Sequence, residues 1–279
     1  DVLGSRGLGD VYKRQILYYR EEELQDGSIF SLPHQRERRV FMIYLRGIAL
    51  NVFPDGNSYL SDLPVVRYLH TVKHLEFRKP VTFFVGENGT GKSTLLEAIA
   101  VASGFNPEGG SRDFSFSTKR SHSDLHQFIT PIKAGYPQDG FFLRVESFYS
   151  TATYLDENSN LLRYGGISLH EQSHGESFLS LITNRFEGHG LYILDEPEAA
   201  LSPHRLLSLL VAIDDLVKND SQFLIATHSP ILMSYPKAEV LELSVDGIRT
   251  ISYKETEHYK LTKQFIDAPE QMLKYLLNG

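Results

Sequence analysis

The chain has 279 residues, of which 41% are hydrophobic and 23% are charged, as is typical of a globular protein with one large domain or two small ones. Its net charge of −7 does not indicate a broad basic face, so binding to nucleic acid is possible but not favoured. The absence of cysteine excludes disulfides, thiolate zinc sites and iron–sulfur clusters. No apolar run approaches the roughly 20 residues of a membrane-spanning helix, so we expect a cytoplasmic protein without a membrane span.

The first residues resemble translated adapter DNA. Residues 5–15 read SRGLGDVYKRQ, which matches a transposon-based sequencing adapter codon for codon. We therefore predict that 1–41 is adapter read-through followed by an upstream segment, and that it contributes nothing to the fold. Met42 is the predicted start, because Arg38 and Arg39 before it can be encoded by AGGAGG, a ribosome-binding sequence. The alternative is that 16–41 is a genuine N-terminal segment.

From Met42 onward, strand patterns alternate with helical ones. Strands are predicted at 42–52, at 72–77 and at 81–85, and the last, VTFFV, is expected to be fully buried. A helix follows at Ser93–Ala102. Residues 104–140 are rich in Gly, Ser, His and Pro without a clear period, which indicates a loop-rich insertion within about 104–172.

The second half of the chain continues this alternation and ends in an amphipathic tail. The predicted elements are a strand at 140–148, a helix at Ser177–Asn184, a strand at 191–194, a helix at Pro203–Val217, a strand at 222–227, a strand pair near 239–253, and one or two helices in Lys260–Leu277 broken near Pro269. This order predicts an α/β fold with a mostly parallel core sheet and an antiparallel β subdomain. We expect a main domain at 42–253 and a helical tail at 254–279.

The stretch VTFFVGENGTGKST, residues 81–94, fits the phosphate-binding P-loop pattern and has the required buried strand before it and helix after it. Glycines let backbone N–H groups curl around phosphate oxygens, and the helix N-terminus adds partial positive charge. Lys92 is expected to reach the β- and γ-phosphates of ATP, and Ser93 to bind Mg²⁺. The predicted nucleotide-binding residues of this loop are Gly86, Glu87, Asn88, Gly89, Thr90, Gly91, Lys92, Ser93 and Thr94.

Two further strands end in residues suited to phosphate chemistry. LYIL is followed by Asp195 and Glu196, and carboxyl ends of parallel strands face the ligand in open α/β sheets. Asp195 is predicted to hold Mg²⁺ through water, and Glu196 to act as general base on the attacking water. His228, which follows the strand QFLIAT, is predicted to contact the γ-phosphate and orient that water.

Together these motifs resemble the ATP-binding-cassette (ABC) ATPases, a class of P-loop enzymes that includes transporter subunits, SMC- and RecF-like proteins and stand-alone AAA family ATPases. The resemblance covers nearly all of 42–253. The family's L-S-G-G-Q signature corresponds here to residues 172–176, QSHGE, in which Ser173 and Gly175 match. The resemblance implies that Ser173 and Gly175 bind the γ-phosphate of ATP held by a second copy, which gives an ATP-dependent homodimer.

This sequence departs from the family pattern at two positions. The glutamine that touches Mg²⁺ from a strand end has no clear match, and Glu146 and Gln138 are the two candidates. The aspartate that follows the Asp-Glu strand is replaced by Ser202, which places the usual communication between subunits in question but not ATP binding.

Residues 170–174 read HEQSH and also match the zinc-peptidase pattern H-E-x-x-H. Both histidines must then share one face of a continuous helix, yet Gly175 and the polar residues before it place the helix start near Ser173–Glu176, after His170. We therefore keep a zinc peptidase built on His170, Glu171 and His174 only as a remote alternative. The pairs His70/His74 and His122/His126 have the same spacing and are interpreted as ordinary histidines.

The sequence thus predicts an ATPase that uses ATP and Mg²⁺, with Lys92, Glu196 and His228 as its catalytic residues. We expect it to act with an unidentified partner protein in a regulatory, defence or DNA-related process. The stretch between Lys92 and Ser173 is too short for a long coiled-coil arm. A transporter subunit and a non-enzymatic nucleotide switch are the alternatives; the intact Glu196 disfavours the switch.

Overall fold

The computed structural model describes residues 41–56, 58–112, 123–158 and 166–277. The predicted adapter and most of the predicted upstream segment, residues 1–40, lie outside the described residues, as does His122 of the His122/His126 pair. No helix in the described part of the chain is long and apolar enough to cross a membrane.

A central sheet of six strands has the order β5-β6-β7-β3-β8-β9. The first five strands of this order run parallel, and β9 pairs antiparallel with β8. This confirms the predicted α/β fold with a mostly parallel core sheet. The strands are β3 (Val81–Val85), β5 (Asp139–Arg144), β6 (Gly190–Asp195), β7 (Gln222–Ala226), β8 (Ala238–Ser244) and β9 (Gly247–Ile251).

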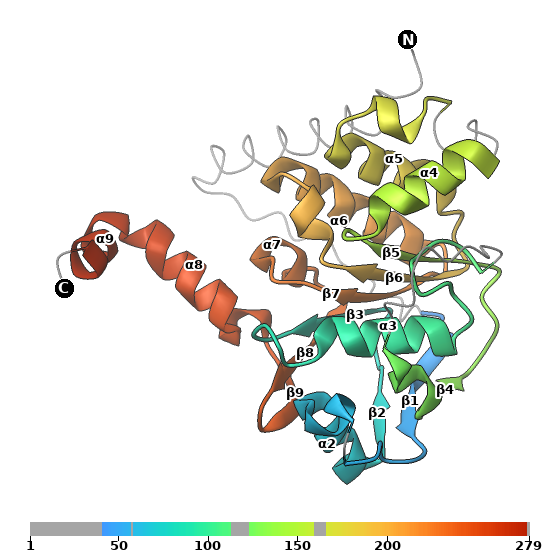
Figure 1. The fold of residues 1–279 in the computed structure, drawn as a ribbon. Helices are drawn as coiled ribbons and strands as arrows, with labels where there is room; N and C mark the ends of the chain where they lie inside the picture. Colours follow the sequence, from blue (N-terminus) through green and yellow to red (C-terminus); the bar gives the residue numbers. More distant parts are fainter. Residues whose placement is uncertain (1–40, 57, 113–122, 159–165, 278–279) are drawn as a thin grey trace, which may run out of the picture.

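Helices cover both faces of this sheet (Figure 1). One face carries α2 (Pro64–Val72) and α3 (Lys92–Ala102). The other carries α4 (Phe148–Asn158), α5 (His174–Arg185), α6 (Pro203–Lys218) and the short α7 (Pro230–Met233). Successive strand residues alternate between the two layers, so that Phe83 packs with the α4–α7 layer and Phe84 with the α3 layer. Burial on both faces explains why the central strands are apolar almost throughout.

A second sheet, antiparallel with the order β2-β1-β4, supplies the predicted β subdomain. It consists of β1 (Leu45–Leu50), β2 (His74–Glu76) and β4 (Ile129–Lys133), and it packs beside α3. The strand β4 and the helix α2 were not predicted, because β4 lies within the loop-rich stretch and α2 directly precedes a predicted strand.

The predicted strand at 140–148 is wrong beyond Arg144. Phe148 begins α4, whose residues Phe148, Ala152 and Leu155 are buried at helical spacing against the α4–α7 layer. Aromatic and threonine residues in FYSTATYL favour a strand locally, and the packing of one helical face overrides that preference. The helix predicted at Ser177–Asn184 exists and begins three residues earlier, at His174.

The C-terminal tail forms two helices, α8 (Glu257–Asp267) and α9 (Pro269–Leu277), which extend away from the body as an arm (Figure 1). The break before Pro269 lies where the sequence places it. Neither helix contains a buried residue, and several large apolar side chains of the arm are more than half exposed, namely Leu261, Ile266, Tyr275, Leu276 and Leu277.

A buried polar cluster fixes the start of β5 to α5 and β6. Asp139 accepts hydrogen bonds from Arg185 Nη1 at 2.8 Å and from the hydroxyl of the fully buried Tyr192 at 2.7 Å. Burial raises the pKa of Asp139, but the hydrogen bonds from Tyr192 and Arg185 outweigh it, so the pKa lies below its ordinary value. The ionised carboxylate therefore stabilises the fold.

We predict that Asp139→Asn lowers the free energy of unfolding by about 1–3 kcal/mol at pH 7, because Arg185 loses its charged partner. A depressed pKa gives stability that is present above the unfolded-state pKa of about 3.9 and is lost as the pH falls through the folded-state value. The difference between variant and wild type should therefore shrink below about pH 4. Urea denaturation at pH 7, 5 and 3.5 measures it.

Asp246→Asn, an exposed position in the β8–β9 turn, is the matched control and should leave stability nearly unchanged at each pH. A loss of stability in Asp139→Asn that is independent of pH would contradict the assignment.

Candidate functional site

The P-loop joins β3 to α3 with three glycines in the left-handed region of φ. At Gly86, with φ of 133°, a Cβ atom would lie 2.1 Å from the carbonyl oxygen of Leu243. At Gly91, with φ of 94°, it would lie 2.7 Å from Val65 Cγ1. Side chains are thus excluded where the loop turns, which leaves its backbone N–H groups facing a ligand. Glu87, Asn88 and Gly89 are exposed at the tip, and Thr94 is half-buried in the first turn of α3.

Lys92 is folded over the loop that precedes it. Its Nζ donates to the carbonyl oxygens of Gly86 at 2.8 Å and Glu87 at 2.9 Å, and the residue is only 5% exposed. Burial lowers its pKa, and the nearby carboxylates of Glu196, Asp195 and Glu198 act in the opposite direction. An ammonium group held over a ring of backbone amides is positioned for a phosphate.

Ser93 and Asp195 are in contact at the carboxyl end of β6. Ser93 Oγ donates to Asp195 Oδ1 at 3.0 Å, although the two residues come from α3 and the end of β6. Asp195 is 6% exposed, and its burial raises the pKa to about 6. A hydroxyl and a buried carboxylate are hard oxygen donors of the kind that Mg²⁺ prefers, so this pair fits the predicted metal site.

Glu196 and His228 form the next part of the site. Glu196 adopts a left-handed backbone conformation with φ of 51° and ψ of 51°, and its N–H donates to the carbonyl of Ala226 at the end of β7. This turn directs its carboxylate toward His228, whose Nε2 lies 3.7 Å from Glu196 Oε1. Burial, together with the charge of Lys92, lowers the pKa of His228 to about 4, so its ring is neutral at pH 7.

Arg144 is a site residue that the sequence analysis missed. Its guanidinium donates to Glu97 Oε2 at 2.6 Å and to Glu146 Oε2 at 3.2 Å, and its Nε lies 3.7 Å from Asp195 Oδ2. The β5–β6 register places Arg144 directly beside Asp195. This cation offsets part of the negative charge that the carboxylates gather here. Only the strand register could have revealed it.

The structure separates the two candidates for the Mg²⁺-contacting glutamine. Gln138 precedes β5 and lies at the N-terminal end of that strand, where its N–H donates to the carbonyl of His189. Glu146 lies just beyond the carboxyl end of β5, next to Arg144. Of the two residues, only Glu146 lies at the carboxyl ends of the strands, where Asp195 also lies. The side chain of Glu146 is 85% exposed.

Glu198 was also missed. Its carboxylate accepts hydrogen bonds from Thr227 Oγ1 at 2.8 Å and from the backbone N–H of His228. Burial raises its pKa despite these bonds. Glu198 thereby joins the turn after β6 to the turn after β7, which fixes His228 relative to Glu196. The left-handed turn at Glu196 brings Glu198 back to the site, and this backbone conformation has no clear sequence signal.

Ser173 and Gly175 lie at the N-terminus of α5. Ser173 is the N-cap residue and forms a capping box with Glu176, with 2.5 Å between Ser173 Oγ and Glu176 Oε2. Arg205 of α6 donates to Ser173 Oγ at 3.2 Å and pairs with Glu176 at 2.9 Å. A Cβ atom on Gly175 would lie 2.4 Å from Arg205 Nη1. α5 packs on the face of the sheet opposite α3, the helix that follows the P-loop, and Gly175 lies close to the carbonyl of Ala200 in the turn after Glu196.

His170 and His174 belong to different elements. His170 lies in a short 3₁₀ turn, Leu169–Glu171, and its Nε2 is 3.0 Å from Thr153 Oγ1, while His174 is the first residue of α5. The continuous helix that zinc chelation by H-E-x-x-H requires is therefore missing. Among the described residues, no three His, Cys, Asp or Glu side chains are grouped so that they could hold a metal ion.

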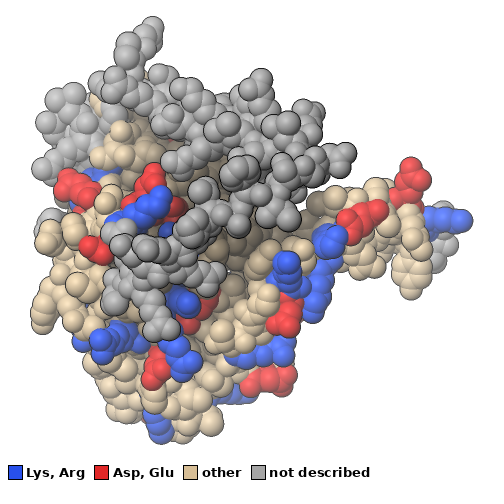
Figure 2. Space-filling model, turned by 180° about the vertical axis from the view of Figure 1, so that it is seen from behind, with Lys and Arg blue, Asp and Glu red and all other residues tan. Residues whose placement is uncertain are grey.

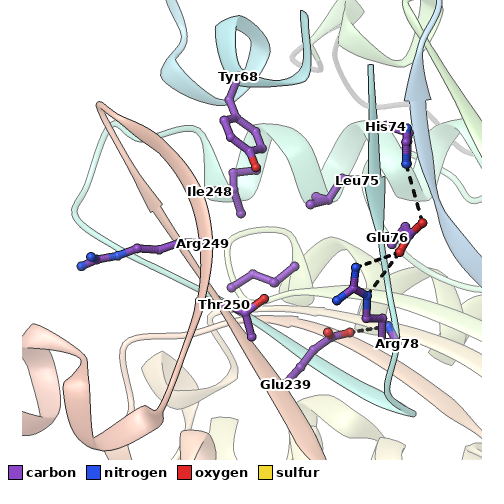
Figure 3. Close-up of a pocket in the computed structure, with 10 residues that line it drawn as sticks. Tyr68, His74, Leu75, Glu76, Arg78, Glu239, Ile248, Arg249 and Thr250 are labelled. Atoms are coloured by element: carbon purple, nitrogen blue, oxygen red, sulfur yellow. Dashed lines mark hydrogen bonds and ion pairs between the residues drawn. The ribbon is translucent and has the colours of Figure 1, made fainter. Parts of the chain in front are cut away.

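Two cavities lie beside β8. One, of about 300 Å³, adjoins the P-loop and is lined by Gly86, Glu87 and His258 among others. The other, of about 220 Å³, lies between β2 and β9 (Figure 3). In the second cavity Arg78 bonds to Glu76 and Arg249 to Glu242. The carboxylate of Glu239 accepts from Thr82 Oγ1 and from the backbone N–H groups of Arg78 and Lys79.

Acidic and basic side chains both occur on the face opposite that of Figure 1, including along the arm (Figure 2). Over the described residues of this face, lysines and arginines are interspersed with acidic residues and form no continuous basic stripe. This distribution does not favour a nucleic-acid interface there.

Two family models match the chain. One, described as "AAA domain", matches residues 66–146, which include the P-loop. The other, described as "AAA domain, putative AbiEii toxin, Type IV TA system", matches residues 156–234, which include Ser173, Asp195, Glu196 and His228. No curated protein matches the chain significantly.

Solved structures that resemble the chain have low sequence identity. The SMC head domain from Thermotoga maritima is 17% identical, with a TM-score of 0.40, and the match covers 75% of this chain and 99% of that one. The cbiO1 protein from Clostridium perfringens, part of the ABC transporter complex cbiONQ, is 16% identical, with a TM-score of 0.46 and coverage of 85% and 100%. An ATP-binding subunit of an ABC transporter is 15% identical, with a TM-score of 0.42 and coverage of 80% and 93%.

The two AAA-domain matches, one on each half of the site, support a P-loop protein with AAA-type domains.

We predict that protein purified without a histidine tag contains no stoichiometric zinc, because His170 and His174 do not share a helix face. Elemental analysis by mass spectrometry measures this. The double variant His170→Ala/His174→Ala should also leave the metal content unchanged. One tightly held zinc per chain that disappears in the double variant would restore the peptidase alternative.

Proposed function

We propose that this protein binds ATP at residues Gly86–Thr94 and hydrolyses it in an Mg²⁺-dependent reaction. The observation that carries the proposal is the meeting of Ser93 with Asp195 at 3.0 Å, beside the Glu196–His228 pair. Three separate segments of the chain converge there: the P-loop, the end of β6 and the loop after β7. Because ATP is the proposed substrate, we also propose that the protein acts in the cytoplasm.

The residues fit the two ligands by shape and by chemistry. Gly86 and Gly91 leave no room for side chains, so backbone N–H groups and Lys92 are available to the phosphates. Ser93 and Asp195 would hold Mg²⁺, Asp195 through water. When bound, Mg²⁺ supplies neutralisation of the negative charge that develops on the phosphate oxygens.

Catalysis in this proposal is positioning and electrostatic stabilisation. Lys92 exchanges its two loop carbonyls for phosphate oxygens and balances their charge. Glu196 accepts a proton from the attacking water, and its 42% exposed side chain is open to such a water. His228, neutral at pH 7, donates a hydrogen bond to the γ-phosphate or the water from Nε2.

We further propose that two copies sandwich two nucleotides. Ser173 and Gly175 lie at the N-terminus of a twelve-residue helix, on the face of the sheet opposite the P-loop helix. We infer that they bind a nucleotide held by another chain, as the resemblance to ABC ATPases implies. The capping box and Arg205 hold Ser173 in place before any partner arrives.

For the biological role, we propose that hydrolysis acts on a partner protein in a regulatory or defence process. The family description that names a type IV toxin–antitoxin system supports this direction. The departures of the signature from the transporter consensus, His174 and Glu176, speak against a transporter subunit. Genes beside this one would discriminate: a multi-span permease favours transport, and a toxin or nuclease favours defence.

We predict that Lys92→Ala reduces ATP hydrolysis about 100-fold or more, because the cation that stabilises the transferring phosphoryl group is lost. Phosphate release at saturating ATP and Mg²⁺ measures it. Lys133→Ala, an exposed lysine of β4, is the matched control and should retain the wild-type rate. Hydrolysis by Lys92→Ala at the wild-type rate would show that the site is misassigned.

We predict that Glu196→Gln forms a stable dimer in ATP and Mg²⁺. Glutamine keeps the shape of glutamate but cannot accept the proton, so chemistry stalls while the γ-phosphate that joins the two chains remains. Wild type should dimerise only transiently. Light scattering coupled to size-exclusion chromatography measures the mass.

Adding Ser173→Arg to Glu196→Gln should return the protein to monomer, because a bulky side chain blocks the helix end. The single variant Ser173→Arg, tested for ATP binding, controls for folding of the P-loop site. A monomeric Glu196→Gln protein at saturating ATP would reject the sandwich dimer while leaving ATP binding intact.

A further inference from the structure

The C-terminal arm contributes a side chain to the ATPase site. His258, in the first turn of α8, has its Nε2 2.8 Å from Nδ1 of His228, and the two rings are 4.6 Å apart. The sequence analysis placed these residues in different units, His228 in the main domain and His258 in the tail. His258 also lines the cavity that adjoins the P-loop.

We propose that His258 is a positioning residue for catalysis, which sets the tautomer and the ring orientation of His228. This inference rests on the proposed ATPase function and deepens it. Its consequence is that the first turn of the C-terminal arm is part of the catalytic apparatus.

The argument starts from the one N–H that a neutral imidazole carries. His228 Nε2 points to Glu196, with 3.7 Å between Nε2 and Oε1. A proton on Nε2 makes His228 a donor toward a carboxylate or a phosphate oxygen, whereas a lone pair there would repel both. Nδ1 must then be an acceptor, and the group within hydrogen-bond distance of it is His258 Nε2. A donor at His258 therefore selects the useful tautomer of His228.

The position of His258 is fixed by the body of the protein. Thr256, the N-cap of α8, is buried; it donates to the carbonyl of Tyr253 at 2.7 Å and accepts from the N–H of Tyr259 at 3.3 Å. The rings of Tyr253 and Tyr259 meet edge to face at 5.3 Å. The first turn of α8 is thus anchored, although the rest of the arm is exposed.

The preceding turn reinforces this anchor. Ser252 and Glu255 form a second capping box over Tyr253–Glu255, and α8 also contacts α7, the helix that directly follows His228. His258, in the first turn of α8, and His228, in the loop that leads into α7, therefore belong to segments that contact each other. Such pre-set geometry is what a functional histidine requires.

The test compares His258→Phe, His258→Gln and a control, Lys260→Gln, which changes an exposed residue of the same helix. Phenylalanine keeps the ring and removes the donor, and we expect kcat to fall about 10-fold or more, the usual range when a functional histidine loses its orienting partner. KM for ATP should change less than kcat, because Lys92 and the P-loop backbone still hold the phosphates in the variant. Glutamine, whose amide N–H can donate, should restore most of kcat.

A spectroscopic measurement reads the tautomer directly. In ¹⁵N-labelled protein, two-dimensional NMR of the imidazole nitrogens distinguishes a protonated Nε2 from a protonated Nδ1. We expect His228 to carry its proton on Nε2 in wild type and in His258→Gln. In His258→Phe we expect a mixture of the two tautomers. His258→Ala, which a helix N-terminus tolerates well, repeats the comparison should the phenylalanine variant fold poorly.

The outcomes separate this inference from the function on which it rests. A wild-type protein that hydrolyses no ATP overturns the proposed function. If wild type is active and both His258→Phe and His258→Ala match Lys260→Gln in kcat and in the His228 spectrum, the inference is wrong and the function stands. In a His228→Ala background, His258→Phe should cause no further loss of kcat. A further loss of the full single-variant size would also overturn the inference.

Discussion

The burial of the Asp195 carboxylate at the end of β6 is the constraint around which the site is arranged. A charge at that depth is costly unless partners surround it, and its raised pKa expresses that cost. Ser93 and Arg144 reduce the cost from two directions, one from α3 and one from β5. Because these partners come from different strands and helices, the parallel register of the sheet has to be in place before the site can exist.

The same constraint explains why cations lie where they do. Negative charge is concentrated near the carboxyl ends of the strands, from Asp195, Glu196, Glu198, Glu97 and Glu146. Lys92 and Arg144 are the basic groups that the structure places among them, each largely buried and each bonded to oxygen atoms. A polyphosphate with its cation changes this balance by adding both signs of charge at once. Binding of that pair therefore disturbs the buried charges less than binding of either ion alone.

The sequence alone predicts the part of the fold that depends on local pattern. VTFFV and LYIL are buried on both faces and are therefore almost entirely apolar, and the P-loop is defined by the spacing of Gly86, Gly89 and Gly91. The elements that escaped prediction, α2, β4 and α4, owe their form to tertiary packing. In the site, Arg144 and Glu198 escaped for a related reason, since a register and a left-handed turn, rather than sequence neighbours, bring them to Asp195 and His228.

The role of His258 could not be predicted from the sequence either, because His258 and His228 are 30 residues apart in the chain. An amphipathic C-terminal helix reads as an appendage, and most of α8 is exposed as an appendage would be. Its first turn nevertheless lies against the strand-end loop that holds His228, because the segment after β9 brings the chain back to the cavity beside the P-loop. A movement of the arm that shifted this turn would alter the hydrogen bond to His228. The arm and the reacting groups are therefore linked through one imidazole pair.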